Sequence, residues 1–199
     1  MAKLKFYYGE MGSGKTASLI ELAKHYENAC AGSTARVIVM KPAIDTKNGD
    51  KLLSRNGDMR AADFLITESD DLFEVITRRF KFDAYAVFID EAQFLTRVQI
   101  DQLLMVTAKL NIEVVAFGLR LNFNLGDENF AGATRLLQVA HELHCIESKC
   151  DICGQNQAIF SCLFENGKLA KNCQTILISD GEKELDTKAI CSKCYFKLC

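Results

Sequence analysis

The sequence has no tryptophan, a single proline and no excess of either charge sign, with 24 basic and 26 acidic side chains. A net charge of -2 provides no electrostatic footprint for strong nucleic-acid binding. Long apolar runs are also absent: the run at 84–89 is too short to cross a bilayer, and the N-terminus lacks the apolar stretch of a signal peptide. We therefore expect a soluble, cytoplasmic protein that binds neither nucleic acid nor a membrane.

Cysteine, by contrast, is abundant, and its placement is uneven. Eight of the nine cysteines lie at or after Cys145, and only Cys30 is earlier. In a reducing cytosol such a count indicates a metal site more than disulfides. A length of 199 residues fits one sizeable domain with a small appendage. We expect a core over residues 1–145 and a metal-bound appendage over 146–199.

Strand-like and helical patterns alternate along the core. Apolar runs typical of buried strands occur at residues 3–8, 36–40, 64–67, 84–89 and 112–117. Helical patterns begin at Lys15 and recur at 71–79 and 97–110. This alternation predicts a mainly parallel sheet with right-handed crossovers. Pro42 is expected to end the second strand, and the polar stretch 45–58 is expected to be a mobile loop.

The first run is followed by a glycine-rich segment that fits the phosphate-loop pattern G-x-x-x-x-G-K-[ST]. Its members are Gly9, Glu10, Met11, Gly12, Ser13, Gly14, Lys15 and Thr16. In such a loop the backbone N–H groups surround phosphates, Lys15 reaches the outer phosphates, and the Thr16 hydroxyl binds Mg²⁺. The alternative is a chance glycine-rich turn, but the position between a strand and a helix favours nucleotide binding. The predicted class is an α/β, phosphate-loop NTPase-like parallel sheet with flanking helices.

Two acidic residues, Asp90 and Glu91, end the most apolar run. In phosphate-loop folds an acidic residue at this place meets the Mg²⁺ held by the loop threonine, which fits Asp90. Glu91 would stand beside the metal and could accept the proton of an incoming hydroxyl group or water. The alternative is that Glu91 is a solvated residue at a helix N-terminus.

Two C-x-x-C pairs lie in the C-terminal part, at Cys150 and Cys153 and at Cys191 and Cys194. The 37 residues between them (154 to 190) leave room for a β-ribbon. A single pair could be a redox site or a coincidence, but two pairs indicate a closed, structural zinc site of four thiolates. The short alternating runs at 158–164 and 175–179 predict the ribbon. The other cysteines are expected to be small buried or terminal thiols, and His141 and His144 are expected at a helix end.

With these motifs in this order, the chain resembles the type II, zinc-containing thymidine kinase family over essentially its whole length. The most specific family-like segments are residues 87–94, which contain Asp-Glu-x-Gln-Phe, and 117–123, which contain Gly-Leu-Arg-x-x-Phe. The remaining family-like segments are 6–16, 41–47, 54–57, 130–133 and the two C-x-x-C pairs.

The resemblance implies that the γ-phosphoryl group of ATP is transferred to the 5′-hydroxyl of thymidine or deoxyuridine. Glu91 would be the base, and Asp45 and Lys47 would close over the phosphates. The nucleoside pocket would be lined by Met11, Phe94, Leu119, Phe123, Phe130 and, weakly, Thr187. The zinc ribbon would act as a substrate lid. The resemblance also implies a homotetramer and feedback inhibition by thymidine triphosphate.

The chain departs from the family pattern mainly in its nucleoside half. It has Lys47 where relatives have arginine, Asn122 for aspartate, Leu163 for arginine and Thr187 for tyrosine, and it lacks a Gly-Gly pair near 179–187. Lysine keeps the charge at position 47 but not the bidentate fork. Two alternatives therefore stay open: a deoxynucleoside kinase of the same fold with a shifted base preference, and a non-catalytic or regulatory ATP-binding zinc protein.

Overall fold

The protein is described by a computed structural model that covers residues 1–123, 129–170 and 185–198. Its strands are β1 Leu4–Tyr8, β2 Arg36–Pro42, β3 Lys51–Leu53, β4 Met59–Ala61, β5 Phe64–Ile66, β6 Ala84–Ile89, β7 Glu113–Gly118, β8 Glu142–Cys145, β9 Phe160–Glu165, β10 Lys168–Leu169 and β11 Leu185–Ile190. Its helices are α1 Lys15–Ala29, α2 Leu72–Arg79, α3 Arg97–Met105, α4 Ala131–Val139 and α5 Ser192–Leu198. Short helical turns lie at η1 Ala92–Phe94 and η2 Val106–Leu110.

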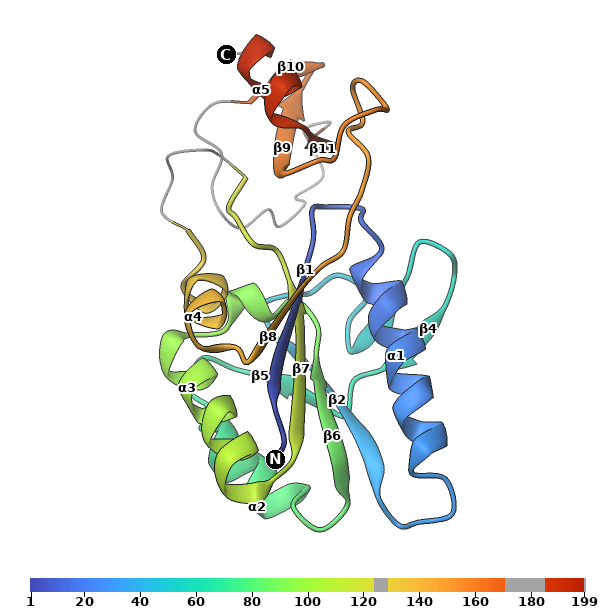
Figure 1. The fold of residues 1–199 in the computed structure, drawn as a ribbon, viewed down its shortest axis with the longest axis vertical. Helices are drawn as coiled ribbons and strands as arrows, with labels where there is room; N and C mark the ends of the chain where they lie inside the picture. The colour runs from blue at the N-terminus through green and yellow to red at the C-terminus, as the bar shows by residue number, and fades with distance from the viewer. Residues whose placement is uncertain (124–128, 171–184, 199) are drawn as a thin grey trace.

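The central sheet has six strands in the order β5-β2-β6-β7-β1-β8, and every described pairing within it is parallel. Helix α1 covers one face, and α2, α3 and α4 lie on the other (Figure 1). Since both faces are covered, the inner strands are apolar along nearly their whole length. The predicted parallel α/β sheet is confirmed.

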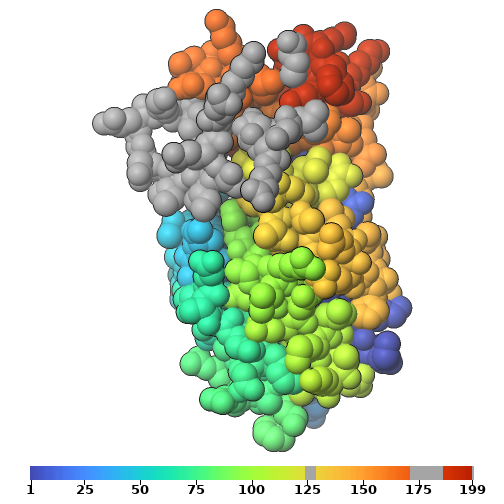
Figure 2. Space-filling view, turned by 90° about the vertical axis from the view of Figure 1, so that its left-hand side faces the viewer, coloured from blue at the N-terminus to red at the C-terminus, as the bar shows by residue number. Residues whose placement is uncertain are grey.

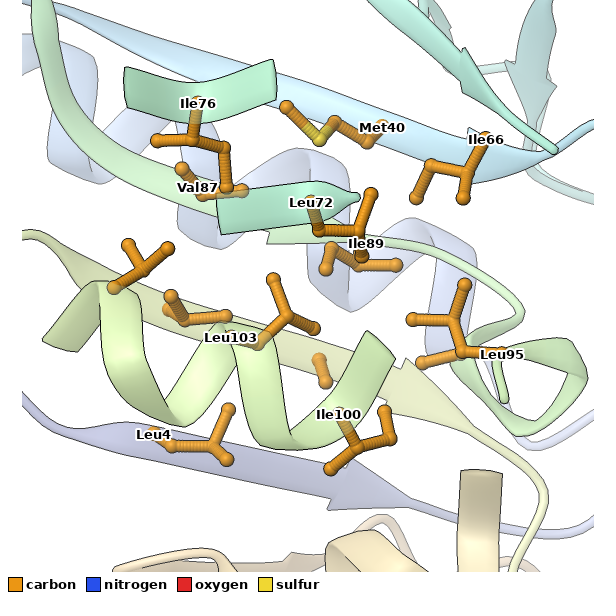
Figure 3. Close-up of a cluster of buried hydrophobic side chains, with 14 of the residues drawn as sticks. Leu4, Met40, Ile66, Leu72, Ile76, Val87, Ile89, Leu95, Ile100 and Leu103 are labelled. Carbon is orange, nitrogen blue, oxygen red and sulfur yellow. The ribbon is translucent and has the colours of Figure 1, made fainter. Parts of the chain in front are cut away.

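Each face of the sheet has its own apolar core. On the α2 and α3 side, Leu72 and Ile76 of α2 and Leu103 of α3 pack toward the sheet, where Met40 and Val87 lie (Figure 3). On the other side, α1 buries a smaller cluster against the inner strands, and its members are Leu19, Ile20, Ala23, Val37, Val39, Leu52, Ala86, Phe88, Val115 and Phe117. The candidate site residues follow the ends of these strands, and packing on both faces holds those strand ends in fixed positions.

Strand β2 ends at Pro42, as predicted, but it includes Lys41 and Pro42 and so extends beyond the predicted apolar run 36–40. Beyond Met40 its partner is β5, with Pro42 opposite Ile66, and its pairing with β6 ends at Met40. A proline is tolerated at such a strand end because one side of the strand there needs no N–H donor.

The segment 45–58, expected to be a loop throughout, contains strand β3. This strand pairs antiparallel with β4, with Leu52 opposite Arg60, and so forms a short hairpin. Leu52 is 2% exposed and belongs to the core cluster under α1, which explains why a polar segment folds here. The hairpin is anchored by a single apolar side chain, too weak a pattern to predict.

Helix α4 and strand β8 were not predicted. The expected helix-end position is close for His141, which is exposed two residues beyond the end of α4, but it is wrong for His144. The His141 ring nitrogen Nδ1 accepts a hydrogen bond from the Leu4 backbone N–H at 3.0 Å, and His144 lies on β8. Its ring stacks on Tyr7 at a centroid distance of 4.3 Å. Strand β8 is an edge strand, and among the described residues its partner is β1.

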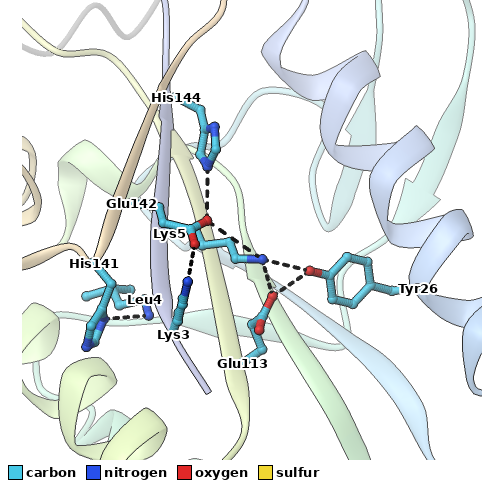
Figure 4. A network of polar contacts seen from close by, with 8 residues as sticks. All are labelled: Lys3, Leu4, Lys5, Tyr26, Glu113, His141, Glu142 and His144. Carbon is cyan, nitrogen blue, oxygen red and sulfur yellow. Dashed lines mark hydrogen bonds and ion pairs between the residues drawn. The ribbon is translucent and has the colours of Figure 1, made fainter. Parts of the chain in front are cut away.

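A polar network ties this edge of the sheet to α1. Lys5 Nζ lies 2.5 Å from Glu113 Oε1 and 3.2 Å from the Tyr26 hydroxyl, and that hydroxyl donates to the same carboxylate at 2.5 Å (Figure 4). Burial alone would lower the pKa of Lys5, but its hydrogen bonds to Glu113 and Tyr26 outweigh that effect and raise the pKa above its usual value. The Lys5 ammonium is therefore charged in the folded protein.

The C-terminal part forms a second, three-stranded antiparallel sheet of order β10-β9-β11 at one end of the molecule (Figures 1 and 2). This confirms the predicted β-ribbon. The run at 175–179 and the lid segment 179–184 lie outside the described residues, as do Cys173 and Cys199. Across the described parts of the chain, none of the helices is long and apolar enough to span a bilayer.

Candidate active site

The predicted site residues meet at the carboxyl ends of the central strands. The phosphate-loop segment follows β1, Asp90 and Glu91 follow β6, and Leu119 follows β7. Because these strands are parallel neighbours, the three connections lie at one edge of the sheet, where α/β folds bind ligands.

The phosphate loop depends on glycine at two positions. Gly12 has φ 76° and Gly14 has φ 88°, in the left-handed region that other residues rarely adopt. Helix α1 begins directly at Lys15, so its positive N-terminal end faces the loop. This is the strand–turn–helix arrangement that the sequence motif predicts.

Lys15 is folded back onto its own loop. Its ammonium donates hydrogen bonds to the carbonyl groups of Gly9 at 3.1 Å and Glu10 at 2.8 Å, and the residue is 7% exposed. Burial lowers the pKa of Lys15, whereas the carboxylates of Glu91, Asp90 and Glu10 act in the opposite direction. A negatively charged ligand in the cavity would stabilise the charged form further.

Asp90 and Thr16 form the pair expected at a magnesium site. The Thr16 hydroxyl donates to Asp90 Oδ2 at 3.1 Å, and the backbone N–H of Glu91 donates to Asp90 Oδ1 at 3.1 Å. Burial and the neighbouring Glu91 charge raise the pKa of Asp90 to about 7. A hydroxyl and a carboxylate beside a phosphate loop are oxygen ligands of the type that Mg²⁺ prefers, so the residues fit this ion.

Glu91 is held in an unusual conformation. Its φ of 50° and ψ of 37° lie in the left-handed region, although it has a side chain. Gln93 Nε2 donates to Glu91 Oε2 at 2.5 Å, and Gln93 Oε1 accepts from the Leu119 backbone N–H at 3.1 Å. Gly118 leaves room for this amide, because a Cβ there would lie 2.6 Å from Gln93 Oε1. The Glu91 carboxylate is thus oriented by a buried amide that is itself fixed.

A cavity of about 230 Å³ lies over the phosphate loop. Glu91, Lys15 and Thr16 line it, together with Lys47 and Arg55 of the segment before β4. Its full lining is Met11, Gly12, Gly14, Lys15, Thr16, Ala17, Lys47, Leu53, Ser54, Arg55, Asn56 and Glu91. Basic groups therefore surround a space beside the loop, as phosphate binding requires.

Asp45, expected beside the phosphates, has a defined partner elsewhere. Its carboxylate lies 2.7 Å from the ammonium of Lys41, which is 1% exposed. The same ammonium donates to the carbonyl groups of Lys47 and Gly49, each at 3.1 Å. Asp45 and Lys41 thus hold the backbone of the loop that places Lys47 at the cavity.

The five predicted nucleoside-binding residues of the core form one apolar cluster with Ala133. It contains Met11, Phe94, Leu119, Phe123, Phe130 and Ala133. The rings of Phe94 and Phe130 meet edge to face, with centroids 5.5 Å apart. Gly132 lets α4 approach η1 closely, because a Cβ there would lie 2.6 Å from two carbonyl oxygens of that turn.

The sixth predicted nucleoside residue, Thr187, belongs to the ribbon sheet. It is on β11, opposite Leu163 of β9, and Leu163 is fully buried.

The four cysteines of the two C-x-x-C pairs converge. Their sulfur atoms all lie within 4.8 Å of one another, and those of Cys153 and Cys191 are 3.9 Å apart. A tetrahedral zinc ion with Zn–S bonds of about 2.3 Å would separate its sulfurs by roughly 3.8 Å, so the set fits zinc. Asn156 Nδ2 points at two of these sulfurs, Cys153 at 3.6 Å and Cys191 at 3.8 Å. Such donors stabilise thiolates in metal sites.

The ribbon contacts the phosphate loop directly through Ser161 of β9. Its hydroxyl accepts from the Met11 backbone N–H at 2.8 Å and donates to Glu10 Oε2 at 2.7 Å. Glu10 is 5% exposed and Ser161 is 1% exposed, so both groups are removed from water. The predicted metal-bound unit is therefore packed onto the nucleotide half of the site.

Three residues of this site were not identified from the sequence as site residues. Gln93 and Arg55 lie within family-like segments, so the sequence marked their positions, but it did not indicate a role for either side chain. Ser161 carried none, because a single serine between two cysteine pairs has no distinguishing pattern. Its partners are about 150 residues away in the chain and become neighbours only on folding.

A phosphate loop, an acidic pair at the end of β6 and a four-cysteine ribbon define a phosphate-loop phosphotransferase with a metal-binding appendage. The sequence model of the thymidine kinase family matches residues 2–195. The chain belongs to the thymidine kinase family.

Curated relatives agree over nearly the full chain. A thymidine kinase of Francisella tularensis subsp. tularensis is 36% identical over 200 residues, covering 97% of this chain and 96% of the relative. A thymidine kinase of Streptococcus pyogenes serotype M3 is 33% identical over 196 residues, covering 98% of each. Among solved structures, Pif1 helicase from Candida albicans is similar over 73% of this chain and 36% of its own, with TM-score 0.45 and 16% identity. That likeness is too distant to bear on activity.

Proposed function

We propose that this chain transfers the γ-phosphoryl group of ATP to the 5′-hydroxyl of thymidine, or deoxyuridine, in nucleotide salvage. The observation that carries the proposal is the position of Glu91. It lines the phosphate cavity together with Lys15 and is joined through Gln93 to Leu119 of the apolar cluster. A carboxylate between a phosphate site and an apolar pocket is suited to take a proton from a bound hydroxyl.

In the reaction, the bond from O5′ to the γ-phosphorus forms as the bond to the β,γ-bridging oxygen breaks. The hydroxyl proton passes to Glu91, and the bonding electron pair leaves with ADP. Lys15 and backbone N–H groups of the phosphate loop bind the phosphates, and Lys47 adds a further cation at the cavity. The chain supplies mainly positioning and charge, as phosphoryl transfer demands.

Thr16 and Asp90 would hold Mg²⁺ together with ATP. When bound, this ion neutralises charge on the β- and γ-phosphate oxygens. The buried position of Asp90 keeps its carboxylate directed at the loop, where Thr16 already contacts it.

The nucleoside base would lie against the apolar cluster of Met11, Phe94, Leu119, Phe123 and Phe130. Cys150, Cys153, Cys191 and Cys194 would bind a structural zinc ion that orders the ribbon unit, residues 146–199, on the kinase core, residues 1–145. A closed set of four thiolates has no open position for substrate, which supports a structural role.

Some expectations depend on the family resemblance alone. They are a homotetramer, feedback inhibition by thymidine triphosphate and the contribution of Thr187, whereas a cytoplasmic location is expected from the composition. One second candidate is a kinase of the same fold with a shifted base preference, because Thr187 stands where relatives have tyrosine. A non-catalytic role is disfavoured because both Asp90 and Glu91 are present and held by specific hydrogen bonds.

The test is a panel of nucleosides incubated with the full-length chain, ATP and Mg²⁺, with each monophosphate quantified by chromatography. We expect the highest kcat/KM for thymidine, with deoxyuridine next and purine nucleosides at background. A higher kcat/KM for another deoxynucleoside would support the shifted preference. No product from any nucleoside would contradict the proposal.

A further inference from the structure

The turn of the β3–β4 hairpin lies against the phosphate loop. A Cβ placed on Gly12 would be 2.9 Å from Arg55 Nη1 and 3.2 Å from its Cζ, so the guanidinium packs directly on that glycine. Arg55 lines the same cavity as Lys15 and Thr16. Its charge is close enough to Lys15 to act, together with burial, toward a lower pKa of that lysine.

The hairpin is held well enough to keep this guanidinium in place. Leu52 anchors it in the core cluster beneath α1. The Ser54 backbone N–H donates to the Asp58 carbonyl at 2.8 Å, and the Asp58 N–H donates to the Ser54 hydroxyl at 3.0 Å. A turn tied at both ends fixes the backbone that carries the exposed Arg55 side chain at the cavity, so little backbone entropy is lost on binding.

The cations of the cavity differ in what they can do. Lys15 already donates to two loop carbonyls, and the ammonium of Lys47 is a point charge. During phosphoryl transfer, charge is spread over the three equatorial oxygens of the γ-phosphoryl group. A planar guanidinium can bind two of these oxygens at once, which an ammonium does not do. Arg55 is the guanidinium among the residues that line this cavity.

We propose that Arg55 is a catalytic residue that contacts two γ-phosphoryl oxygens through its guanidinium fork during transfer, a contact that Lys47 cannot make. This inference rests on the proposed function. Arg55 neither gives nor takes a proton: the hydroxyl proton passes to Glu91 and the leaving electron pair to ADP, as described above. Its effect is on the transition state, so the substitution should change kcat more than the KM for ATP.

The experiment measures kcat and both KM values of R55A, R55K and the control K51A with thymidine, ATP and Mg²⁺. Lys51 is an exposed cation on the same hairpin, outside the cavity lining. We expect kcat to fall about 100-fold or more in R55A and to remain well below wild type in R55K, with K51A within about twofold of wild type. A kcat of R55A within about threefold of wild type would overturn the inference.

The double variant R55A/K47R shows whether R55A loses activity because the guanidinium is missing or because the hairpin is misfolded. A guanidinium restored at position 47, which lines the same cavity, should recover at least about tenfold of the lost kcat, whereas a damaged hairpin would not respond. No recovery in the double variant would contradict the role of the fork. A wild-type chain that phosphorylates no nucleoside would overturn the proposed function together with this inference, whereas an active wild type with unimpaired R55A overturns the inference alone.

Discussion

Gln93 holds Glu91: its side-chain N–H donates to the glutamate carboxylate at 2.5 Å. The oxygen of the same amide accepts a hydrogen bond from the backbone N–H of Leu119, in the connection that follows β7. The amide is 2% exposed, so neither bond is shared with solvent. The proposed base and the proposed nucleoside pocket are thereby fixed relative to each other by one side chain.

The first prediction concerns this amide. Gln93→Leu removes both hydrogen bonds, so Glu91 can rotate away from the hydroxyl that it should deprotonate. We expect kcat with thymidine to fall about 10- to 100-fold while the KM for ATP changes little. Steady-state kinetics check this, with Gln138→Leu, an exposed glutamine of α4, as the control. An unchanged kcat would mean that Glu91 keeps its orientation without Gln93.

The second prediction concerns the contact between ribbon and phosphate loop. Ser161→Ala leaves the buried Glu10 carboxylate and the Met11 N–H without this partner. We expect unfolding free energy to fall by about 1–3 kcal/mol and the KM for ATP to rise, because the loop loses a fixed point. Ser161→Thr keeps the hydroxyl and should restore both values. Urea unfolding gives the unfolding free energy, and an ATP titration gives the KM for ATP. If both values of Ser161→Ala equalled those of wild type, the contact would have no stabilising role.

The third prediction concerns the four cysteines. Zinc chelation or Cys150→Ser should loosen the ribbon and raise the KM for thymidine more than the KM for ATP. The ATP value should also rise somewhat, because Ser161 joins the ribbon to the phosphate loop. Cys145→Ser is the matched control, since this thiol is exposed and outside the cluster. Metal analysis should find about one zinc per chain, and an unchanged thymidine KM after chelation would argue against a substrate lid.

The fourth prediction concerns stability at the edge of the sheet. Glu113→Gln removes the carboxylate that Lys5 and the Tyr26 hydroxyl share, at a cost of about 1 kcal/mol. Because the folded pKa of Lys5 is raised, this stabilisation is complete below the unfolded value of about 10.4 and is lost as pH rises through the folded value. The difference in unfolding free energy between wild type and Glu113→Gln, measured by urea unfolding, should therefore be constant from about pH 7 to 10. It should decrease above about pH 10.

The control for that measurement is Glu74→Gln, which removes an exposed ion pair with Arg78. It should cost at most a few tenths of a kcal/mol. An equal cost for both variants would mean that the partly buried network contributes no more than a surface ion pair.

Much of the core could be predicted from the sequence because its signals are local. The apolar run of β6 and the glycines and Lys15 of the phosphate loop each form a contiguous pattern. The two cysteine pairs predicted a cluster because C-x-x-C spacing itself brings two thiols together. These patterns do not depend on the rest of the chain.

The remainder depended on tertiary contacts. Strand β8 has weak strand character and exists because β1 offers it a free edge. The β3–β4 hairpin is fixed by Leu52 beneath α1, and without that packing Arg55 would have no defined position. Ser161 and Gln93 act through partners that only the assembled fold brings within hydrogen-bonding distance.

Glu91→Gln tests the account most directly. The amide keeps the size of the side chain but cannot accept the proton of the 5′-hydroxyl. Formation of thymidine monophosphate should fall by about 1,000-fold, while the dissociation constant of ATP with Mg²⁺ stays within about twofold of wild type. Turnover that survives the substitution, or an equal loss of turnover and ATP binding, would contradict the assignment of Glu91 as the base.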